Sequence, residues 1–253
     1  MPPTFPARMI GGTEVGEIGN EELAQIVETL ERCVTPARRD RIRDVLAART
    51  RDVILVLEHL RNPHNGAAVF RTAEAFGFFE VHVVPAEGPL DVSPRVSSGS
   101  HKWLEVHTHS VIDDAYGELE ARGYRIYASS LHGDAIPLSE LDVRTPIALV
   151  LGNERDGLST AAVESAHGRF RIPMWGFVES FNISVAAAVC SYDVATRRRQ
   201  LGLAPKLRDR DRAELHAVYL AKAMDSARAI LARAGLPYPI VEDDGFRMEG
   251  ELE

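Results

Sequence analysis

Short apolar runs alternate with longer segments of helical spacing along most of the chain. Residues 53–60, "VILVLEHL", form a nearly continuous apolar run with β-branched residues, which is typical of a strand buried on both faces. Further strands are expected at 79–84, 104–108, 124–130, 146–152 and 169–173. Helices are expected at 67–77, 110–122, 159–166 and 182–200. Strands that alternate with helices predict an α/β fold, with helices on both faces of a mostly parallel sheet.

The segments near the two ends of the chain do not follow this alternation. The first twenty residues look unstructured, and Asn20 is expected to cap a short acidic helix over 21–32. Thr35 and Pro36 have the pattern of an N-cap followed by a first helical residue. They predict an Arg-rich helix that runs to about Arg49.

One more helix is expected over 209–235, before the sequence "GLPYP". The composition shifts at both ends then divide the chain into three parts. We expect an acidic N-terminal extension over 1–34, a main domain over 35–205 that includes the Arg-rich helix, and a C-terminal helix with an acidic tail over 206–253.

The formal net charge of −8 argues weakly against a nucleic-acid partner until its distribution is considered. Residues 1–34 carry a net −4 and residues 240–253 a net −5, so the rest of the chain carries +1. Within that part, residues 36–51 hold six arginines against two aspartates, and "TRRRQ" follows at 196–200. Affinity for a polyanion depends on such local patches. The arginines could bind RNA or could lie on solvated helix faces, and the sequence leaves both interpretations open.

Composition narrows the class of protein rather than its activity. The 253 residues are 45% hydrophobic and 26% charged, as in soluble globular proteins with a sizeable core. The two cysteines, Cys33 and Cys190, make neither a disulfide framework nor a metal site, which fits a reducing compartment. We expect no signal peptide and no membrane-spanning segment. These features predict a cytoplasmic protein without a metal cofactor.

Three segments share one design, in which a buried strand ends, the chain turns and polar residues follow. In open α/β sheets this edge is where ligands bind. The first segment, "NPHNGAAVFR", places Asn65 in a turn and Arg71 inside an apolar stripe. A partly buried arginine needs an anion, which favours a binding role. The alternative is that Asn65 caps a helix and Arg71 is a surface or salt-bridge residue.

The second segment is "LVLGNERDGLS" at 149–159. Gly152 ends the strand and permits a sharp turn or the close approach of a ligand, and Ser159 is expected to cap the next helix. Glu154 projects from the turn and is either a functional group or a solvated side chain. The segment is not a nucleotide-binding loop, because no Gly-Lys-Ser/Thr follows and GxGxxG is absent from the chain. HExxH, GxSxG and Cys/His zinc spacings are absent as well.

The third segment, "IPMWGFVESFNISVAAAVC" at 172–190, joins a strand to an alanine-rich helix. Ser180 or Asn182 can cap that helix, which leaves backbone N–H groups and the positive end of the helix dipole facing a site. The small side chains that follow let another backbone pack closely. The alternative is a capped core helix without a ligand.

Together the three segments resemble, in order and spacing, the motifs of the SpoU branch of the SPOUT methyltransferases. The resemblance covers about 35–240 and is closest to the members that methylate guanosine 18 of tRNA. "TPARRDRIRDVLAART" resembles their Arg-rich N-terminal helix, "SSGSHKW" an inner loop, and "GLPYP" the end of the longer bacterial members. The resemblance implies a SPOUT-type fold with a C-terminal deep trefoil knot, flanked by N- and C-terminal helices, and a homodimer.

The resemblance also implies a reaction, the transfer of a methyl group from S-adenosylmethionine to the ribose 2′-hydroxyl of guanosine 18 in the tRNA D-loop. Arg71 would be the central catalytic residue, and Asn65 would position it. Arg71 would act as a general base helped by an RNA phosphate. Alternatively, it would hold that phosphate and stabilise the developing alkoxide, since arginine stays protonated in proteins. Glu154, Ser180 and Asn182 would order the site.

Binding residues follow from the same resemblance. The residues expected to contact the cofactor, largely through their backbone, are Ser129, Leu151, Gly152, Ile172, Met174 and Phe181. The residues expected to hold RNA, mostly at phosphates, are Arg41, Arg49, His64 and Arg198. His64 could instead be a simple turn residue. One position of an arginine pair in the family is Thr196 here, and Arg197 or Arg199 could replace it.

Two rival functions stay open at this stage. The first is the same chemistry on ribosomal RNA, but members of that type usually carry a separate N-terminal RNA-binding domain, and residues 1–34 are too short for one. The second is a non-catalytic RNA-binding protein with the same fold. The intact set of five candidate catalytic residues argues against it, and cofactor binding would discriminate the two.

Overall fold

The computed structural model describes residues 9–10, 13–15, 18–86, 100–131, 133–153, 155–203, 205 and 207–242. They form two compact units. One unit combines the described residues up to Thr50 with those from Pro205 onward, and the other runs from Arg51 to residue 203. No described helix is long and apolar enough to cross a membrane. The predicted catalytic residue Glu154 lies outside the described residues.

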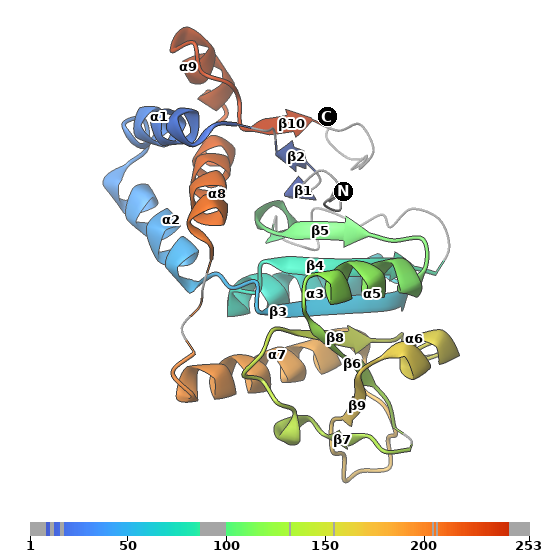
Figure 1. Cartoon of the computed structure of the whole chain (residues 1–253). Coiled ribbons are helices and arrows are strands. Elements are labelled where there is room, and N and C mark those ends of the chain that lie inside the picture. The colour runs from blue at the N-terminus through green and yellow to red at the C-terminus, as the bar shows by residue number, and fades with distance from the viewer. Residues whose placement is uncertain are drawn as a thin grey trace. The chain divides into compact units, whose positions relative to one another are not determined.

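The larger unit is built on a parallel sheet (Figure 1). Seven strands of the described residues form it, each parallel to its neighbours. In order across the sheet they are β5 (Glu105–Thr108), β4 (Glu80–Pro85), β3 (Val53–Leu60), β8 (Ile147–Leu151), β6 (Arg125–Ser129), β9 (Gly168–Arg171) and β7 (Ile136–Pro137). The predicted α/β fold around a parallel sheet is confirmed. The sequence pattern misses β7, because two residues show no strand periodicity.

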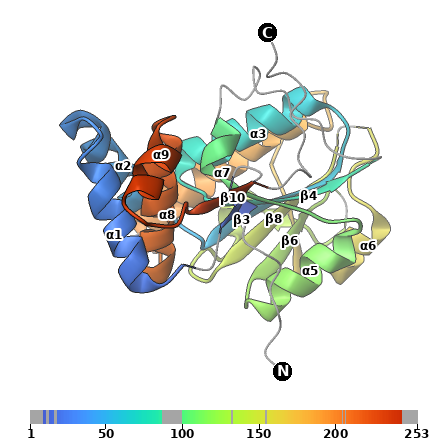
Figure 2. The ribbon, with the colours of Figure 1, turned by 90° about the horizontal axis from the view of Figure 1, so that it is seen from above.

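Helices cover both faces of this sheet, as Figure 2 shows. On one face lie α3 (Pro63–Phe76) and α7 (Ile183–Gln200), and on the other α5 (Ile112–Ala121) and α6 (Thr160–Ser165). The apolar run of β3 explains why both faces are covered. Leu55 and Leu57 belong to the core with α3 and α7, whereas Ile54 and Val56 belong to the core with α5 and α6. All four side chains are fully buried, and each burial stabilises the fold by about 1.5–3 kcal/mol.

The connections hold two 3-10 helices, η1 (Ser100–Trp103) and η2 (Leu138–Glu140). The helix ends follow local sequence signals. Gly77 ends α3 with a left-handed φ of 79°, as its position after the apolar spacing predicts. The deep trefoil knot implied by the family resemblance stays a prediction.

The smaller unit is mainly helical. Its elements are β1 (Met9–Ile10), β2 (Thr13–Val15), α1 (Asn20–Glu31), α2 (Pro36–Ala48), α8 (Asp209–Lys222), α9 (Ala227–Arg233) and β10 (Ile240–Glu242). Strand β2 pairs antiparallel with both β1 and β10. Helix α1 buries Leu23, Ile26 and Leu30, which share one face, and it packs against α8. The predicted Arg-rich helix is α2, where Thr35 Oγ1 accepts the N–H of Arg38 at 3.2 Å.

Two predictions near the N-terminus are wrong. The first twenty residues contain β1 and β2 instead of lacking structure. Asn20 does not cap α1, because Gly19 takes the N-cap and donates its N–H to Glu22 Oε2 at 3.0 Å. Asn20 is the first helical residue, and its side-chain oxygen accepts a hydrogen bond from Arg210 at 2.5 Å.

Two helix boundaries also differ from the expectation. The helix expected over 209–235 is broken between α8 and α9, where Asp225 and Ser226 favour helix ends over helix interiors. Asn65 lies in the first turn of α3 instead of in a preceding turn, because Pro63 starts the helix. The compact units also differ from the expected three-part division, since α2 belongs with α1 and α8.

Candidate active site

Four neighbouring parallel strands, β3, β8, β6 and β9, end at one edge of the sheet. Ser129 is the last residue of β6, and Leu151 is the last residue of β8. Ile172 follows β9 directly. The residues expected to contact a cofactor therefore gather at the carboxyl ends of the strands, where α/β sheets bind ligands.

The first motif forms the start of α3. Asn62 caps the helix, since its side-chain oxygen accepts the N–H of His64 at 2.9 Å. Asn65 is half-buried in the first turn. Arg71 is exposed, and it makes no hydrogen bond or ion pair with any described residue. The expectation that Arg71 is partly buried is wrong, because it lies on the outer side of the α3 stripe formed by Val69, Phe70 and Ala73. Its guanidinium is instead open to a ligand.

The third motif meets the first through one hydrogen bond. Asn182 caps α7, where its side-chain oxygen accepts the N–H of Ser184 at 2.9 Å. Its side-chain amide donates to Asn65 Oδ1 at 3.2 Å. Of the two predicted caps, Asn182 takes the position, and Ser180 is exposed in the segment before the helix. The contact brings together two of the predicted catalytic residues that are 117 positions apart.

Helix α7 also buries the one cysteine of the larger unit. Cys190 is fully buried in the core with α3. Burial raises the pKa of the Cys190 thiol to about 12. A buried, protonated thiol is not a nucleophile, so this cysteine packs as a small apolar side chain.

The second motif forms a tight turn after β8. A Cβ atom on Gly152 would lie 2.2 Å from the carbonyl carbon of Gly157, so glycine is required there. Ser159 caps α6 as predicted, and its hydroxyl accepts the N–H of Ala162 at 3.1 Å. Gly152 thus packs closely against Gly157, and Ser159 fixes the start of α6.

Sequence reasoning missed two residues that hold this turn, Glu58 and Asn153. Both side chains are buried, at 2% and 7% exposure. Glu58 accepts hydrogen bonds from Ser159, and Asn153 donates one to the carbonyl of His59. The sequence does contain a signal that could have pointed to Glu58: the polar pair Glu58 and His59 interrupts an otherwise apolar strand.

The segment 172–182 runs from β9 to α7 without regular secondary structure. Within the described part of the chain, the backbone N–H groups of residues 174–181 donate no hydrogen bond to another backbone group. Ile172 and Met174 are half-buried, whereas Phe181 is 36% and Trp175 93% exposed. A partly apolar segment with available N–H groups fits the adenosine of S-adenosylmethionine, which has a flat apolar ring and several acceptors.

Two of the four predicted RNA-binding residues are exposed. Arg41 on α2 and His64 on α3 both face solvent. Arg49 is buried at 1% exposure, and its Nε donates to the hydroxyl of Tyr219 at 3.2 Å. Arg49 is therefore bound within the protein, and its expected phosphate contact stays a prediction.

Arg198 is buried as well, at 7% exposure. Its guanidinium donates to the carbonyl of Val143 at 2.6 Å and pairs with Asp52. An arginine held in this way fastens α7 to the segments before β3 and β8, and its expected phosphate contact stays a prediction. The sequence could not distinguish it, because burial of one helix face was not visible in a run of three arginines.

A second cluster of ionisable side chains lies on β4, β5 and α5. Four of its members offer ligand atoms within 4.8 Å of one another, a set that could hold a metal ion: Glu80, His82, His107 and Glu118. The rings of His82 and His107 are stacked, however, with centroids 4.5 Å apart and planes 12° apart. Their nitrogen lone pairs therefore lie in nearly parallel planes and do not converge on one ion. Arg51 and Arg122 already bind Glu80, at 2.6 Å and 2.7 Å, as in a buried ion-pair network.

The pKa values in this network follow from burial and charge. Burial lowers the pKa of His82, and it lowers the pKa of His109 from 6.5 to about 4. The two rings are joined by a hydrogen bond of 2.8 Å. Burial would raise the pKa of Glu80, but hydrogen bonds from Arg122 and His82 hold it well below its usual value. Burial also opposes the charged form of His107, but neighbouring carboxylates raise its pKa overall.

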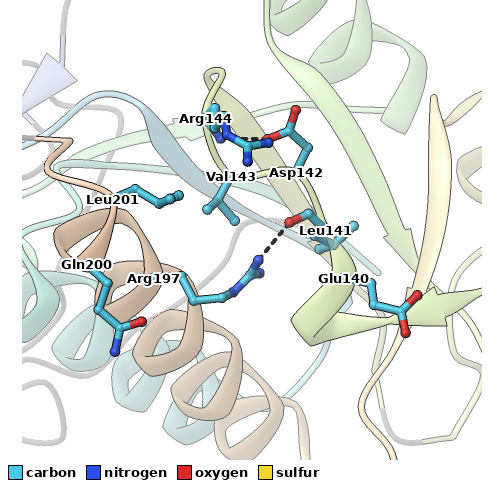
Figure 3. Close-up of a pocket in the computed structure, with 8 residues that line it drawn as sticks. All are labelled: Glu140, Leu141, Asp142, Val143, Arg144, Arg197, Gln200 and Leu201. Atoms are coloured by element: carbon cyan, nitrogen blue, oxygen red, sulfur yellow. Dashed lines mark hydrogen bonds and ion pairs between the residues drawn. The ribbon is translucent and has the colours of Figure 1, made fainter.

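A cavity of about 420 Å³ lies between residues 140–144 and the end of α7 (Figure 3). Arg197 lines it and donates to the carbonyl of Leu141 at 2.7 Å, as Figure 3 shows. It also donates to the carbonyl of Leu138 at 2.9 Å. The predicted catalytic and cofactor residues do not line this cavity. Arg197 is thus engaged with the protein, and the cavity is separate from the candidate active site.

The parallel sheet, with the first and third motifs joined near its carboxyl edge, agrees with the arrangement expected of a SPOUT-class methyltransferase. The sequence model described as the SpoU rRNA Methylase family matches residues 52–192, more than half of the chain. The chain belongs to this family.

Relatives and solved structures agree with this assignment. The tRNA (guanosine(18)-2′-O)-methyltransferase of Thermus thermophilus is 40% identical over 67% of this chain and 87% of its own length. The Escherichia coli protein of that name is 33% identical over 84% of this chain and 93% of its own. The crystal structure of the Aquifex aeolicus TrmH/SpoU tRNA modifying enzyme is 30% identical, with a TM-score of 0.69 over 77% of this chain and 98% of that one.

Among the solved neighbours that carry a cofactor is the SpoU methyltransferase AviRb from Streptomyces viridochromogenes in complex with AdoMet, or S-adenosylmethionine. It is 25% identical, with a TM-score of 0.55 over 62% of this chain and 64% of its own.

Proposed function

We propose that this chain transfers a methyl group from S-adenosylmethionine to the ribose 2′-hydroxyl of guanosine 18 in the D-loop of tRNA. The observation that carries the proposal is the hydrogen bond between Asn65 and Asn182. It joins the first and third motifs next to a helix that presents Arg71 to solvent. The named tRNA methyltransferases that share a third or more of the sequence support the choice of substrate.

The reaction makes an O–CH₃ bond and breaks an S–CH₃ bond, and the 2′-hydroxyl must lose its proton. When bound, S-adenosylmethionine supplies an electrophilic methyl group. The protein has to align the attacking oxygen and stabilise the charge that develops on it. Arg71 would serve this second role, because a permanent positive charge that is bound to no other described residue can bind an RNA phosphate and the developing alkoxide together.

The remaining site residues order this centre. Asn182 fixes the start of α7 and, through its amide, the first turn of α3 that leads to Arg71. Ser180 is exposed two residues before this cap and would face the ribose. Glu154, which lies outside the described residues, keeps its expected role in ordering the site.

The cofactor would be held along the carboxyl edge of the sheet. Ser129, Leu151 and Gly152 supply the ends of two strands, and Ile172, Met174 and Phe181 supply the segment before α7. The requirement for glycine at position 152 leaves an edge of backbone there, which suits a ligand read through main-chain groups.

RNA would be held by the exposed cations, Arg41 on α2 and His64 and Arg71 on α3. Such contacts bind phosphate and give affinity without sequence choice. A cytoplasmic location, where tRNA is modified, belongs to the same proposal.

A homodimer is also part of the proposal. Helix α7 exposes an apolar stripe at spacings of four and three residues, formed by Val185, Val189 and Tyr192 at 45%, 36% and 63% exposure. Tyr192 also contacts the ring of Phe76 on α3 edge-on at 6.4 Å. Apolar side chains lined up along one helix are typical of a face that a second copy covers.

The test is methyl transfer from labelled S-adenosylmethionine to an unmodified tRNA transcript, with guanosine 18 intact or replaced. Wild type and Arg71→Ala are compared, and Glu140→Gln serves as an exposed control outside the site. Label on the intact tRNA alone, lost with Arg71→Ala and kept with Glu140→Gln, supports the proposal. Label on ribosomal RNA instead would retain the chemistry and reject the substrate. No transfer to either RNA, together with no binding of S-adenosylmethionine, would reject the enzyme in favour of a non-catalytic RNA-binding protein.

A further inference from the structure

We propose that Glu58 and Asn153 are positioning residues that hold the second-motif turn in its active geometry from the end of β3. This inference rests on the proposed function for its kinetic readout. Glu58 lies outside the three motifs that the sequence suggested, and Asn153 lies within the second motif but was given no role there. Both act through the backbone of the turn and do not touch the reacting groups.

Glu58 fastens the far end of the turn. Its side chain is 2% exposed and lies near the end of β3. One carboxylate oxygen accepts the N–H of Ser159 at 2.8 Å, and the other accepts the hydroxyl of Ser159 at 2.7 Å. Among the described residues, no cation pairs with this carboxylate. A buried carboxylate is costly, so a site that keeps one and satisfies it with two donors fixes those donors firmly.

Asn153 fastens the near end. Its side-chain oxygen accepts the N–H groups of Arg155 and Asp156, both at 2.8 Å, which folds the chain over its own side chain. Its amide donates to the carbonyl of His59 at 3.1 Å and to Asp156 at 3.2 Å. All four side-chain bonds that an asparagine can make at such a turn are therefore used.

The attachment point on β3 is itself unusual. His59 has a φ of 56°, the one positive φ among the described residues other than glycine. The pairing of β3 with β4 shifts between Glu58 and Leu60 at this residue. A left-handed residue in a buried strand costs energy and persists where its surroundings fix it. Here it turns the carbonyl of His59 toward Asn153, away from the sheet ladder.

The end of β3 thus controls two motifs. Residues 58 and 59 hold both ends of the turn that contains Gly152 and Glu154. Three residues after His59, Asn62 caps α3, which carries Asn65 and Arg71. Small shifts of catalytic groups cost large factors in rate, so a shared anchor for two motifs has a catalytic consequence.

The experiment compares Glu58→Gln and Asn153→Asp with wild type. Glu58→Gln replaces one acceptor facing Ser159 by an N–H₂ group. Asn153→Asp keeps the acceptor for Arg155 and Asp156 but turns an oxygen toward the carbonyl of His59. We expect each to lower kcat for tRNA by about 10- to 100-fold and to raise the Kd for S-adenosylmethionine about tenfold, as for outer-shell residues elsewhere. The KM for tRNA should stay within about twofold, because the exposed cations bind RNA.

Two controls separate positioning from stability. Leu119→Ala removes a fully buried side chain on α5, away from the turn, and lowers the melting temperature without touching the site. Ser159→Thr keeps both donors to Glu58 and should retain activity. The inference is supported if Leu119→Ala and Ser159→Thr keep wild-type kcat below their melting temperatures while the two test variants do not.

The inference is overturned if Glu58→Gln and Asn153→Asp match wild type, or if Leu119→Ala shows the same kinetic loss. Failure of the proposed function looks different, because wild type would then transfer no methyl group to tRNA. In that case the calorimetric Kd for S-adenosylmethionine decides alone, and unchanged values in both test variants reject the positioning role.

Discussion

The side-chain amide of Asn182 donates to the side-chain oxygen of Asn65 at 3.2 Å, across 117 positions of sequence. The same Asn182 caps α7 through its oxygen, so one side chain serves a helix end and a contact between motifs. The two roles use different atoms. They can therefore be separated by substitution.

Asn182→Asp should separate them. Aspartate retains the acceptor for the N–H of Ser184, and it is as good an N-cap as asparagine. It loses the donor to Asn65 and places two oxygens together. We expect a melting temperature close to that of wild type and a kcat lowered by about 10-fold or more, as when one oriented contact is lost. Asn182→Ala, which also loses the cap, should cost about 1 kcal/mol in unfolding free energy. Equal kcat values for Asn182→Asp and wild type would contradict the contact's role.

Arg71→Lys should lose most activity although it keeps the charge. A guanidinium binds a phosphate with two parallel donors, and an ammonium does not. Loss of an oriented donor to a developing oxyanion costs about 100- to 1,000-fold in kcat. Because Arg71 is exposed, the substitution should change the unfolding free energy of the protein by less than about 0.5 kcal/mol. Single-turnover rates and chemical denaturation of the two proteins check both statements.

Gly152→Ala should disrupt the turn. The new Cβ would lie 2.2 Å from the carbonyl carbon and 2.3 Å from the carbonyl oxygen of Gly157. The backbone must move, at a cost of about 1–3 kcal/mol, and binding of S-adenosylmethionine should weaken with it. Gly117→Ala is the matched control, since a Cβ there meets nothing within 4 Å inside α5. That control should stabilise the helix slightly. Cofactor affinity that is unchanged in Gly152→Ala would contradict the assignment.

Stability should fall on acidification because of His82 and His109. Both have pKa values lowered by burial, His109 from 6.5 to about 4, so they are neutral when folded and take up protons when unfolded. Below pH 6.5 the unfolded state binds more protons, and stability falls until about pH 4. Glu80 stabilises the folded state as long as it is ionised, because its pKa is lower in the folded than in the unfolded protein. This stabilisation is lost only at still lower pH, as the carboxylate becomes protonated. His107 has the opposite effect on stability, because its pKa is raised in the folded protein. It stabilises the fold at low pH, and this stabilisation is lost as the pH rises.

Urea unfolding at several pH values between 7.5 and 4 measures this dependence. His109→Gln should flatten the curve between about pH 6.5 and 4, because one of the histidines whose pKa is lowered by burial is gone. His64→Gln is an exposed control that should leave the curve unchanged. A His109→Gln curve that coincides with that of wild type would show that the network does not titrate in this range.

Val189→Asp should produce a monomer. Val189 lies in the middle of the exposed apolar stripe on α7, where a buried carboxylate would be costly in a dimer and harmless in a monomer. Val111→Asp, which also replaces an exposed valine but lies before α5, should leave the oligomeric state unchanged. Sedimentation at micromolar concentration distinguishes the two. A wild type that sediments as a monomer would reject the dimer.

The sequence predicts the elements of the larger unit well, because buried parallel strands leave uninterrupted apolar runs such as 53–60. The helix caps Thr35 and Ser159 were predictable for another reason, because each cap binds a backbone N–H only three residues away. Long-range partners were not. The buried state of Arg49 depends on Tyr219, 170 positions later, and no local pattern records such a contact.

The candidate site divides along the same line. Asn65, Arg71 and Asn182 come from recognisable motifs, and the contact between Asn65 and Asn182 supports their grouping. The exposure of Arg71 was not predictable, because an arginine between apolar residues is expected to be buried with them. Only the structure shows which face of α3 packs against the core. Glu58 was hidden inside an apolar run, although a carboxylate there already needed an explanation.

The smaller unit draws its helices from opposite ends of the chain, and this has a consequence for synthesis on the ribosome. Helix α1 leaves the ribosome early, but its apolar face, formed by Leu23, Ile26 and Leu30, packs against α8, which ends at Lys222. The strands and helices from 51 to 203 are complete before then. The nascent chain therefore finishes the parallel sheet first, while the apolar face of α1 stays exposed until the residues of α8 have been translated.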